Sequence, residues 1–392
     1  MKKINLLIDY PLTKDINQWL GLSFPPILYN SISSDPRFNI FHMNNYSNEN
    51  LDCVLVFSAG SQKILLNKKV NQIKFKSLIM LFYPKIKKII FFFGFFFGLY
   101  KLYYYQRWNF RSLNYEKRIK KILQKNKNIK IIHRLDGSHH VICKYYGYDH
   151  TVQLINKISS LTIYQSKYCK EIWENIRKTI FGPSININPK KSLIISNGVD
   201  LDFFNPLGKK NNLEGKWKIL HLSASSLPNK GLSKVLEFAE IFKNNSEFKF
   251  YLIGDQVNDP ICGNDIKYYP NVEYLGFIKD KEKLSEYLRS CDIYLYPSKD
   301  DCSSNSILEA MASGLPVLTI DSGGNKELIC KEDLNAGVII DEKNPAYSMK
   351  IIIEQYDEYK KNCLEIVRKY HDIKIISKRY ADEIYSNCTD FK

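Results

Sequence analysis

The sequence predicts an α/β protein made of two doubly wound, Rossmann-like domains. Short apolar runs that end in polar turns alternate with helical stretches, and this alternation starts again after a polar, Gly- and Asn-rich stretch at 205–215. The 392 residues are enough for two domains that each bury a core. We therefore expect an N-terminal domain at 1–204, a C-terminal domain at 205–370 and a C-terminal helix within 371–392.

The first domain is expected to hold a parallel sheet. Each of its apolar runs is short and bounded by polar or turn residues, as buried parallel strands are. A helix is expected at 167–178. The expected strands lie at 4–9, 39–42, 53–57, 129–135, 161–165 and 193–196.

The second domain repeats the alternation of strands and helices. Its expected strands lie at 218–222, 248–253, 272–275, 292–296 and 317–320. The helices between them are expected at 231–243, 281–289 and 306–312. The final helix, expected at 371–385, has an amphipathic pattern and follows the second domain.

The composition restricts the compartment and the partners. The formal charge is +16, which is compatible with nucleic acid, an anionic membrane surface or phosphorylated small molecules, and also with a base bias of the genome. We find no basic motif with base-stacking aromatic residues, and therefore expect no nucleic-acid partner. The nine cysteines form no C-x-x-C pair, and the first apolar run is too short for a signal peptide, so we expect a cytoplasmic protein.

The segment 84–108 departs from the α/β pattern. Its apolar run, at 89–100, reads IIFFFGFFFGLY and is bordered by lysines and aromatic residues. The run is too short for the roughly 20 residues of a membrane-spanning helix. It fits either a buried core helix or a segment on a membrane surface. Because six phenylalanines would cover every face of a helix, and because aromatic residues beside Lys and Arg suit the membrane interface, we favour the membrane surface.

A polar loop and a helix start follow the strand at 292–296. The helix is expected to begin among Ser303, Ser304 and Asn305, which are good N-cap residues, and Ser306 could form a capping box with Glu309. This places a helix N-terminus at the carboxyl edge of a parallel sheet. Such an edge is where ligands bind in open α/β sheets, and the helix N-terminus suits a diphosphate.

The segment from Tyr296 to Pro316 resembles the signature of family 4 retaining glycosyltransferases, which have the GT-B fold: two Rossmann-like domains that face each other across a cleft. Seven residues separate Asp301 from Glu309, and the family usually has Glu at the first position. The resemblance implies that Glu309 holds the ribose hydroxyls of the donor and that Asp301 faces its sugar. The alternatives are a helix-capping glutamate and a solvated loop acid.

Other segments extend the resemblance over most of 129–392. They place Asn197 just before the interdomain linker, Lys230 on the donor phosphates, and Gly254 and Phe277 near the nucleotide base. Ser225 stands where the family has a phosphate-binding Arg. Lys230 taken alone would be an ordinary surface lysine.

The cluster His133–His140 follows an expected strand of the first domain. It occupies the place where the family positions residues toward the acceptor and the sugar. Asp136 or a nearby histidine such as His133 could accept a proton or stabilise positive charge at the anomeric carbon. A histidine after a strand is more often structural. We see no spacing of metal ligands, and the resemblance implies that no metal or other cofactor is needed.

The resemblance implies a retaining glycosyltransferase of the hexosyltransferase type. It would move a sugar from a nucleotide-diphosphate-sugar to a glycan or lipid-linked acceptor, in the assembly of cell-surface polysaccharide or glycolipid. It would work at the cytoplasmic membrane face, with the final helix crossing back onto the first domain. The alternative is a catalytically weak GT-B-like binding or scaffold protein, which Ser225 favours because a phosphate-binding charge is missing there.

Overall fold

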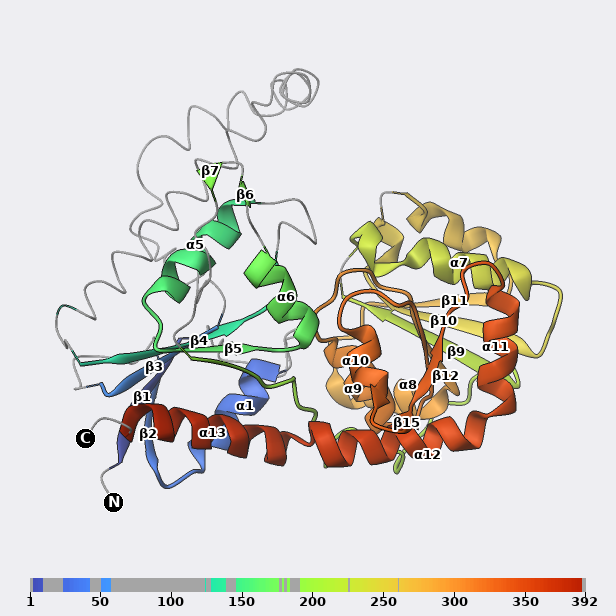
Figure 1. The fold of residues 1–392 in the computed structure, drawn as a ribbon. Helices are drawn as coiled ribbons and strands as arrows, with labels where there is room; N and C mark the ends of the chain where they lie inside the picture. Colours follow the sequence, from blue (N-terminus) through green and yellow to red (C-terminus); the bar gives the residue numbers. More distant parts are fainter. Residues whose placement is uncertain are drawn as a thin grey trace, which may run out of the picture.

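A computed structural model shows two α/β domains side by side, each built on a parallel sheet (Figure 1). This confirms the predicted fold class. The segment predicted to lie on a membrane, 84–108, and also Ser225, His139 and His140, lie outside the described residues. The structure describes residues 3–9, 24–42, 51–57, 124, 128–138, 146–175, 178–179, 182–183, 191–224, 226–259 and 261–389.

The N-terminal sheet has the strand order β2-β1-β3-β4-β5-β8, and every neighbouring pair is parallel. All residues of β3 and β5 are buried, as the continuous apolar runs predicted. Its strands are β1 (Ile4–Asp9), β2 (Phe38–His42), β3 (Cys53–Phe57), β4 (Lys130–Leu135), β5 (Leu161–Tyr164) and β8 (Ser192–Ile194). The helices described in this domain are α1 (Phe24–Ser33), α5 (Tyr146–Lys157) and α6 (Lys167–Asn175).

The C-terminal sheet has the order β11-β10-β9-β12-β13-β16 and is also parallel throughout. Its strands are β9 (Trp217–Ser223), β10 (Phe248–Gly254), β11 (Val272–Gly276), β12 (Ile293–Tyr296), β13 (Val317–Thr319) and β16 (Gly337–Ile339). Its helices are α7 (Leu232–Ile241), α8 (Lys281–Ser290), α9 (Asn305–Ala312), α10 (Asn325–Ile329), α11 (Pro345–Glu354) and α12 (Tyr356–Ile366).

Short strands and 3-10 helices lie between the larger elements. Two antiparallel pairs of very short strands are β6 (Lys178–Thr179) with β7 (Gly182–Pro183), and β14 (Cys330–Lys331) with β15 (Leu334–Asn335). Single turns of 3-10 helix lie at Pro228–Lys230 and Gln256–Asn258, and a longer 3-10 helix lies at Gly263–Tyr268.

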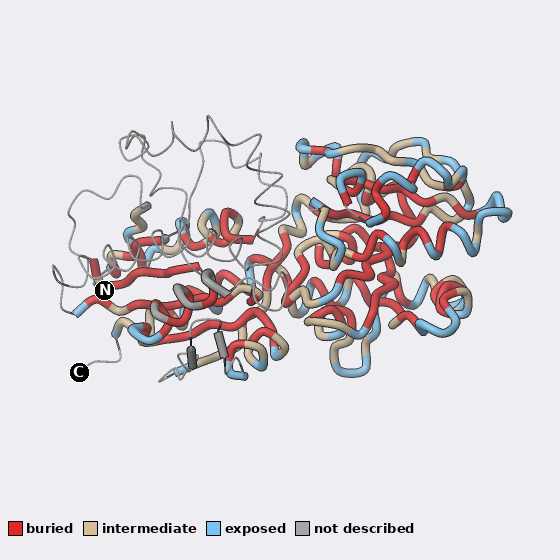
Figure 2. Tube along the Cα trace, turned by 90° about the horizontal axis from the view of Figure 1, so that it is seen from above, coloured by how far each residue is buried: buried red, intermediate tan, exposed pale blue. Residues whose placement is uncertain are grey.

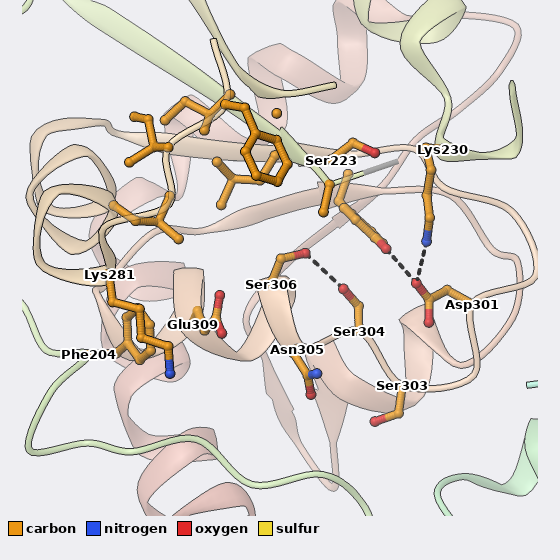
Figure 3. A pocket seen from close by; sticks show the side chains of 18 residues that line it. Phe204, Ser223, Lys230, Lys281, Asp301, Ser303, Ser304, Asn305, Ser306 and Glu309 are labelled. Carbon is orange, nitrogen blue, oxygen red and sulfur yellow. Dashed lines mark hydrogen bonds and ion pairs between the residues drawn. The ribbon is translucent and has the colours of Figure 1, made fainter. Parts of the chain in front are cut away.

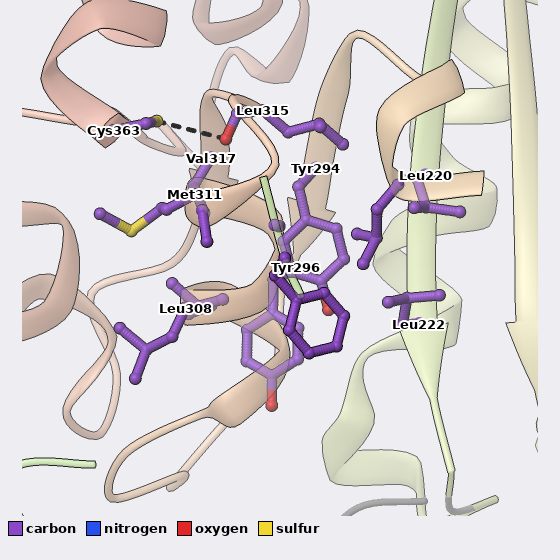
Figure 4. Close-up of a cluster of buried hydrophobic side chains, with 14 of the residues drawn as sticks. Leu220, Leu222, Tyr294, Tyr296, Leu308, Met311, Leu315, Val317 and Cys363 are labelled. Carbon is purple, nitrogen blue, oxygen red and sulfur yellow. Dashed lines mark hydrogen bonds between the residues drawn. The ribbon is translucent and has the colours of Figure 1, made fainter. Parts of the chain in front are cut away.

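Most residues of the strands in both sheets are buried (Figure 2). In the C-terminal domain one cluster packs β9, β12 and β13 against α9 and α12, and Figure 4 shows part of it. Its members Leu220, Leu308, Met311 and Val317 are fully buried, and each such side chain contributes roughly 1.5–3 kcal/mol by leaving water. This packing fixes α9 against the sheet and so fixes the position of its N-terminus.

The last helix returns to the first domain. A π-helical turn, Val367–His371, follows α12, and α13 (Ile373–Thr389) then runs along the N-terminal domain (Figure 1). The Tyr380 ring is fully buried, with its centroid 5.9 Å from that of Phe24. A Cβ on Gly198 would lie 3.1 Å from Ile373, so the absence of a side chain there allows the close crossing. The C-terminal segment therefore completes the core of the first domain.

Candidate functional site

A pocket lies in the C-terminal domain, where β9, β10 and β12 end and α9 begins (Figure 3). Its volume is about 280 Å³. This is the carboxyl edge of the parallel sheet, where the sequence predicted a ligand site. The sequence-predicted residues that line it are Lys230, Gly254, Phe277, Asp301, Ser303, Ser304, Asn305, Ser306 and Glu309.

Helix α9 begins at Asn305, with Ser304 as its N-cap. The Ser304 hydroxyl accepts a hydrogen bond from the Ile307 amide, with the Oγ and N atoms 3.4 Å apart. The capping box predicted from Ser306 and Glu309 is wrong, because Ser306 lies inside the first turn. Its Oγ instead receives a 2.7 Å hydrogen bond from the Tyr294 hydroxyl, which ties the helix start to β12.

The start of α9 offers donors to an anion. The first backbone N–H groups of a helix have no partner within it and lie at the positive end of its dipole. Beside them, the Ser303 side chain is buried, and its hydroxyl has no hydrogen-bond partner among the described residues. Since a buried hydroxyl without a partner costs free energy, this group is suited to bind a ligand oxygen.

Lys230 and Asp301 meet in an ion pair at the pocket wall. The Lys230 Nζ lies 3.0 Å from Asp301 Oδ2, and the Tyr296 hydroxyl donates to the same oxygen at 2.6 Å. Burial opposes the charge of Asp301, but Lys230 and the Tyr296 hydrogen bond outweigh it and lower the pKa of this carboxyl. The pKa of Lys230 is raised in turn, because Tyr296 and Asp301 outweigh the effect of its burial. Both groups are therefore ionised at neutral pH.

A glycine pair supports the loop that carries Asp301. The Gly324 amide donates to the Asp301 carbonyl at 2.7 Å. A Cβ on Gly323, whose φ is +65°, would lie 2.3 Å from that same carbonyl oxygen. A glycine pair without side chains allows another backbone to come close. The backbone that it approaches is that of the loop itself, so the glycines act by holding Asp301 in place.

The other end of the pocket is formed by Gly254 and by residues outside the predicted site. Gly254 has φ +127°, and a Cβ there would lie 1.8 Å from the Ser223 carbonyl oxygen, so only glycine fits at this strand end. Lys281, in the first turn of α8, and Phe204, which directly precedes the linker, also line the pocket (Figure 3). Lys281 brings a second positive charge that we did not predict.

The predicted catalytic residues of the first domain do not line this pocket. His133 is fully buried in β4, with Nδ1 3.3 Å from the Asn156 amide of α5, so it is a core residue of a strand that is buried on both faces. Asp136 follows β4, and its carboxylate, 39% exposed, accepts hydrogen bonds from Arg134 and Gln165. Asp136 is thus positioned for contact with solvent or a ligand, whereas the structure gives His133 no such access.

The two domains meet through polar contacts around the pocket loop. Asn197, predicted to bind the donor, is not a lining residue. It donates instead to the Ser303 carbonyl at 3.0 Å and to Asn305 Oδ1 at 2.9 Å. Across the same interface, the Glu327 carboxylate accepts hydrogen bonds of 2.8 Å from the Lys167 and Tyr168 amides at the start of α6. The amino-acid sequence alone does not reveal such pairs, because the partners lie 108 and 160 positions apart.

The described residues form neither a cluster of metal ligands nor a membrane-spanning helix. No group of three or more His, Cys, Asp or Glu side chains there is arranged to hold a metal ion. None of the helices in that part of the chain is long and apolar enough to cross a membrane.

The fold and the pocket together define a GT-B protein, with the pocket in the second of its two Rossmann-like domains. The solved structures of a glycosyltransferase from Rickettsia africae and of HepE from Anabaena, in complex with UDP and glucose, have this fold too. Each aligns with a TM-score of 0.57, at 15% and 16% identity, over 100% and 98% of this chain and 100% of their own. These likenesses establish the fold.

Residues 205–368, which make up most of the C-terminal domain, match the family glycosyl transferases group 1. Protein CapJ of Staphylococcus aureus is 28% identical over 183 residues, 45% of each chain. The UDP-Gal:alpha-D-GlcNAc-diphosphoundecaprenol alpha-1,3-galactosyltransferase of Escherichia coli is 30% identical over 178 residues, 40% of this chain and 44% of the enzyme. The matches thus span slightly less than half the length of these curated relatives.

Proposed function

We propose that the protein is a retaining glycosyltransferase that moves a sugar from a nucleotide-diphosphate-sugar to a glycan or lipid-linked acceptor. The observation that carries this proposal is the pocket at the start of α9, in the domain of the group 1 family. The pocket combines lysines, two acidic side chains and a helix N-terminus. These groups complement the diphosphate and the hydroxyls of such a donor.

In the proposed reaction the bond between the anomeric carbon and the β-phosphate oxygen breaks, and the nucleoside diphosphate leaves with the electron pair. The amides at the start of α9, together with Lys230, stabilise the charge that develops on it. The acceptor hydroxyl attacks the anomeric carbon from the same face, and its proton passes to the departing phosphate oxygen. No metal has a role in this scheme.

The acidic residues have separate roles in this proposal. Glu309, in the second turn of α9, binds the ribose hydroxyls, while Asp301 orients Lys230 and faces the donor sugar. In the first domain, Asp136 remains our candidate for contact with the acceptor or the anomeric carbon because its carboxylate is partly exposed. His133 is not included, since it is fully buried.

Replacement of Glu309 tests the proposal. A panel of nucleoside diphosphates is first screened for a rise in the unfolding temperature, because a ligand stabilises the folded state to which it binds. Glu309→Ala should then abolish sugar transfer while the circular dichroism spectrum stays that of the wild type. The control is Glu282→Ala, which removes an exposed carboxylate of α8 and should leave transfer unchanged.

The outcomes separate the candidate functions. Full transfer by Glu309→Ala would exclude the proposed role of that residue. Binding of a nucleoside diphosphate without transfer from any donor of the panel would favour the alternative, a catalytically weak binding protein. No stabilisation by any nucleotide would contradict both.

We further propose that the acceptor is presented at the cytoplasmic membrane face and that the protein binds there peripherally. The support comes from the sequence: the Phe-rich run of 84–108, its basic and aromatic borders, and the net charge of +16. The Escherichia coli relative, whose name specifies a diphosphoundecaprenol-linked acceptor, fits this proposal.

Vesicle flotation tests the membrane proposal. The wild type should float with anionic vesicles and be partly released at high salt, because charge attraction is screened while apolar insertion is not. The variant with serine at Phe92, Phe93, Phe95 and Phe96 should be released almost completely, with an unchanged circular dichroism spectrum. Failure of the wild type to float would assign the run to the core and favour a soluble acceptor.

A further inference from the structure

Arg134 is an arginine whose charge is enclosed within the first domain. It lies near the end of β4 with 2% of its side chain exposed, and its guanidinium carbon lies 4.8 Å from the Phe24 ring centroid and 5.4 Å from that of Phe57. A buried charge is costly unless its hydrogen bonds are satisfied. The surroundings of Arg134 satisfy them with side chains from several elements.

The partners of Arg134 point in two directions. Its Nε donates to the Tyr380 hydroxyl of α13 at 3.1 Å, while its terminal nitrogens donate to Asp136, Gln165 and Asn197. An arginine has donors only, so it forces the side-chain oxygens of Gln165 and Asn197 to face it. Arg134 thereby selects one of the two orientations of each amide.

The orientation of Asn197 matters because its other side faces the pocket loop. With Oδ1 held by Arg134, Nδ2 donates to the Ser303 carbonyl at 3.0 Å and to Asn305 Oδ1 at 2.9 Å. If the amide were reversed, an oxygen would face two acceptors. Ser303 and Asn305 flank the N-cap of α9 and line the pocket. Arg134 is thus connected to the start of α9 through one side chain.

We propose that Arg134 is a positioning residue that acts through Asn197 to hold the start of α9 in the geometry required for sugar transfer. This inference rests on the proposed function and assigns a part of it to the first domain. Arg134 does not touch the donor. The consequence is that the N-terminal domain sets the position of the groups that stabilise the leaving diphosphate.

Two near-isosteric variants test this inference. Asn197→Asp keeps an oxygen toward Arg134 but replaces the donor to Ser303 and Asn305 with a second oxygen. Arg134→Lys keeps the charge but loses the fork that reaches both Asn197 and Tyr380. For both variants we expect kcat to fall by about 10- to 100-fold, because small displacements of groups that position a reactant cost rates of this order. The KM for the donor should change much less.

Two control variants distinguish positioning from general destabilisation. Ile132→Ala makes a cavity in the same strand, and should lower the unfolding temperature at least as much as the test variants while the folded protein keeps the wild-type kcat. Tyr380→Phe removes the hydroxyl on the other side of Arg134 and leaves its bond to Asn197, so kcat should again be that of the wild type. Wild-type kcat in Asn197→Asp or Arg134→Lys would overturn the inference while leaving the proposed function intact.

A second measurement applies even if no transfer is found. Hydrogen exchange of the Ser306 and Ile307 amides reports the order of the first turn of α9. It should be faster in Asn197→Asp and Arg134→Lys than in the wild type, and unchanged in Tyr380→Phe. Unchanged exchange in both test variants would overturn the inference, whereas absence of transfer in the wild type, with any donor, would count against the proposed function alone.

Discussion

Lys230 has a different state from the one that its position alone suggests. A lysine whose role is to bind phosphates would be expected to have no acidic partner before the ligand binds. Lys230 instead forms an ion pair with Asp301, which also accepts a hydrogen bond from Tyr296. The pair keeps the local charge near zero before a ligand binds, and only about a quarter of each side chain is exposed. A diphosphate that enters must therefore share Lys230 with Asp301.

The effect of Lys230 on binding should depend on the phosphates. Lys230→Met keeps the aliphatic stem and removes the charge. It should weaken the binding of a nucleoside diphosphate about 10- to 100-fold, the usual range for a charged hydrogen bond, and the binding of the matching nucleoside much less. Isothermal titration calorimetry with both ligands measures the difference.

The control for this prediction is Lys279→Met, which removes an exposed lysine near the pocket rim without touching its lining. It should leave both affinities unchanged. Equal losses of nucleoside and diphosphate binding in Lys230→Met would show that the lysine acts on the shape of the pocket rather than on the phosphates.

Sequence analysis could find the site residues whose position is set by the nearest strand or helix. Lys230, Ser303 and Glu309 follow strand ends or lie on the first two turns of a helix, and such places converge at one edge of a parallel sheet. The environment of His133 could not be predicted in this way, because its burial depends on α5, which packs on β4 and brings Asn156 to the imidazole. Arg134, its neighbour, was overlooked since a buried arginine is defined by partners from other elements.

At the scale of elements, the expected strands agree with the structure to within a few residues, from β1 to β13. Continuous apolar runs between turn residues carry enough information for that. The edge strand β16 was missed because Gly337–Ile339 is too short to produce a pattern. The start of α9 was predicted only as a choice among Ser303, Ser304 and Asn305, and the helix begins at Asn305 with Ser304 as its N-cap. Four consecutive polar residues, Ser303–Ser306, all suit an N-cap, and the choice of Ser304 depends on the bond between Ser306 and Tyr294.

At the scale of the whole molecule, long-range contacts complete both domains. The first domain buries Ile376, Tyr380 and Ile384 of α13, which arrive from the end of the chain. Periodicity predicted an amphipathic helix there, and only the resemblance indicated that it crosses back. The contacts at the domain interface had no signal in the sequence, because each joins residues that are ordinary in their own segments.

Glu327 makes the clearest of these contacts between the domains. Its carboxylate caps α6 of the other domain by accepting from the Lys167 and Tyr168 amides, both at 2.8 Å. A carboxylate at a helix N-terminus is favoured by the helix dipole. Glu327→Gln should weaken this contact by removing the charge, and Glu327→Ala should remove it at a cost of about 1 kcal/mol in the free energy of unfolding, as for a lost N-cap.

Hydrogen exchange of the Lys167 and Tyr168 amides measures the Glu327 contact directly. Their exchange should be fastest in Glu327→Ala, intermediate in Glu327→Gln and slowest in the wild type. Small-angle scattering should show a larger radius of gyration for Glu327→Ala, because one of the bonds that hold the domains together is gone. The control is Lys326→Ala, whose side chain is exposed on the same helix and pairs only with Asp321 at 3.5 Å among the described residues. If Lys326→Ala accelerates exchange of the two amides as much as Glu327→Ala does, the effect comes from α10 as a whole rather than from the cap.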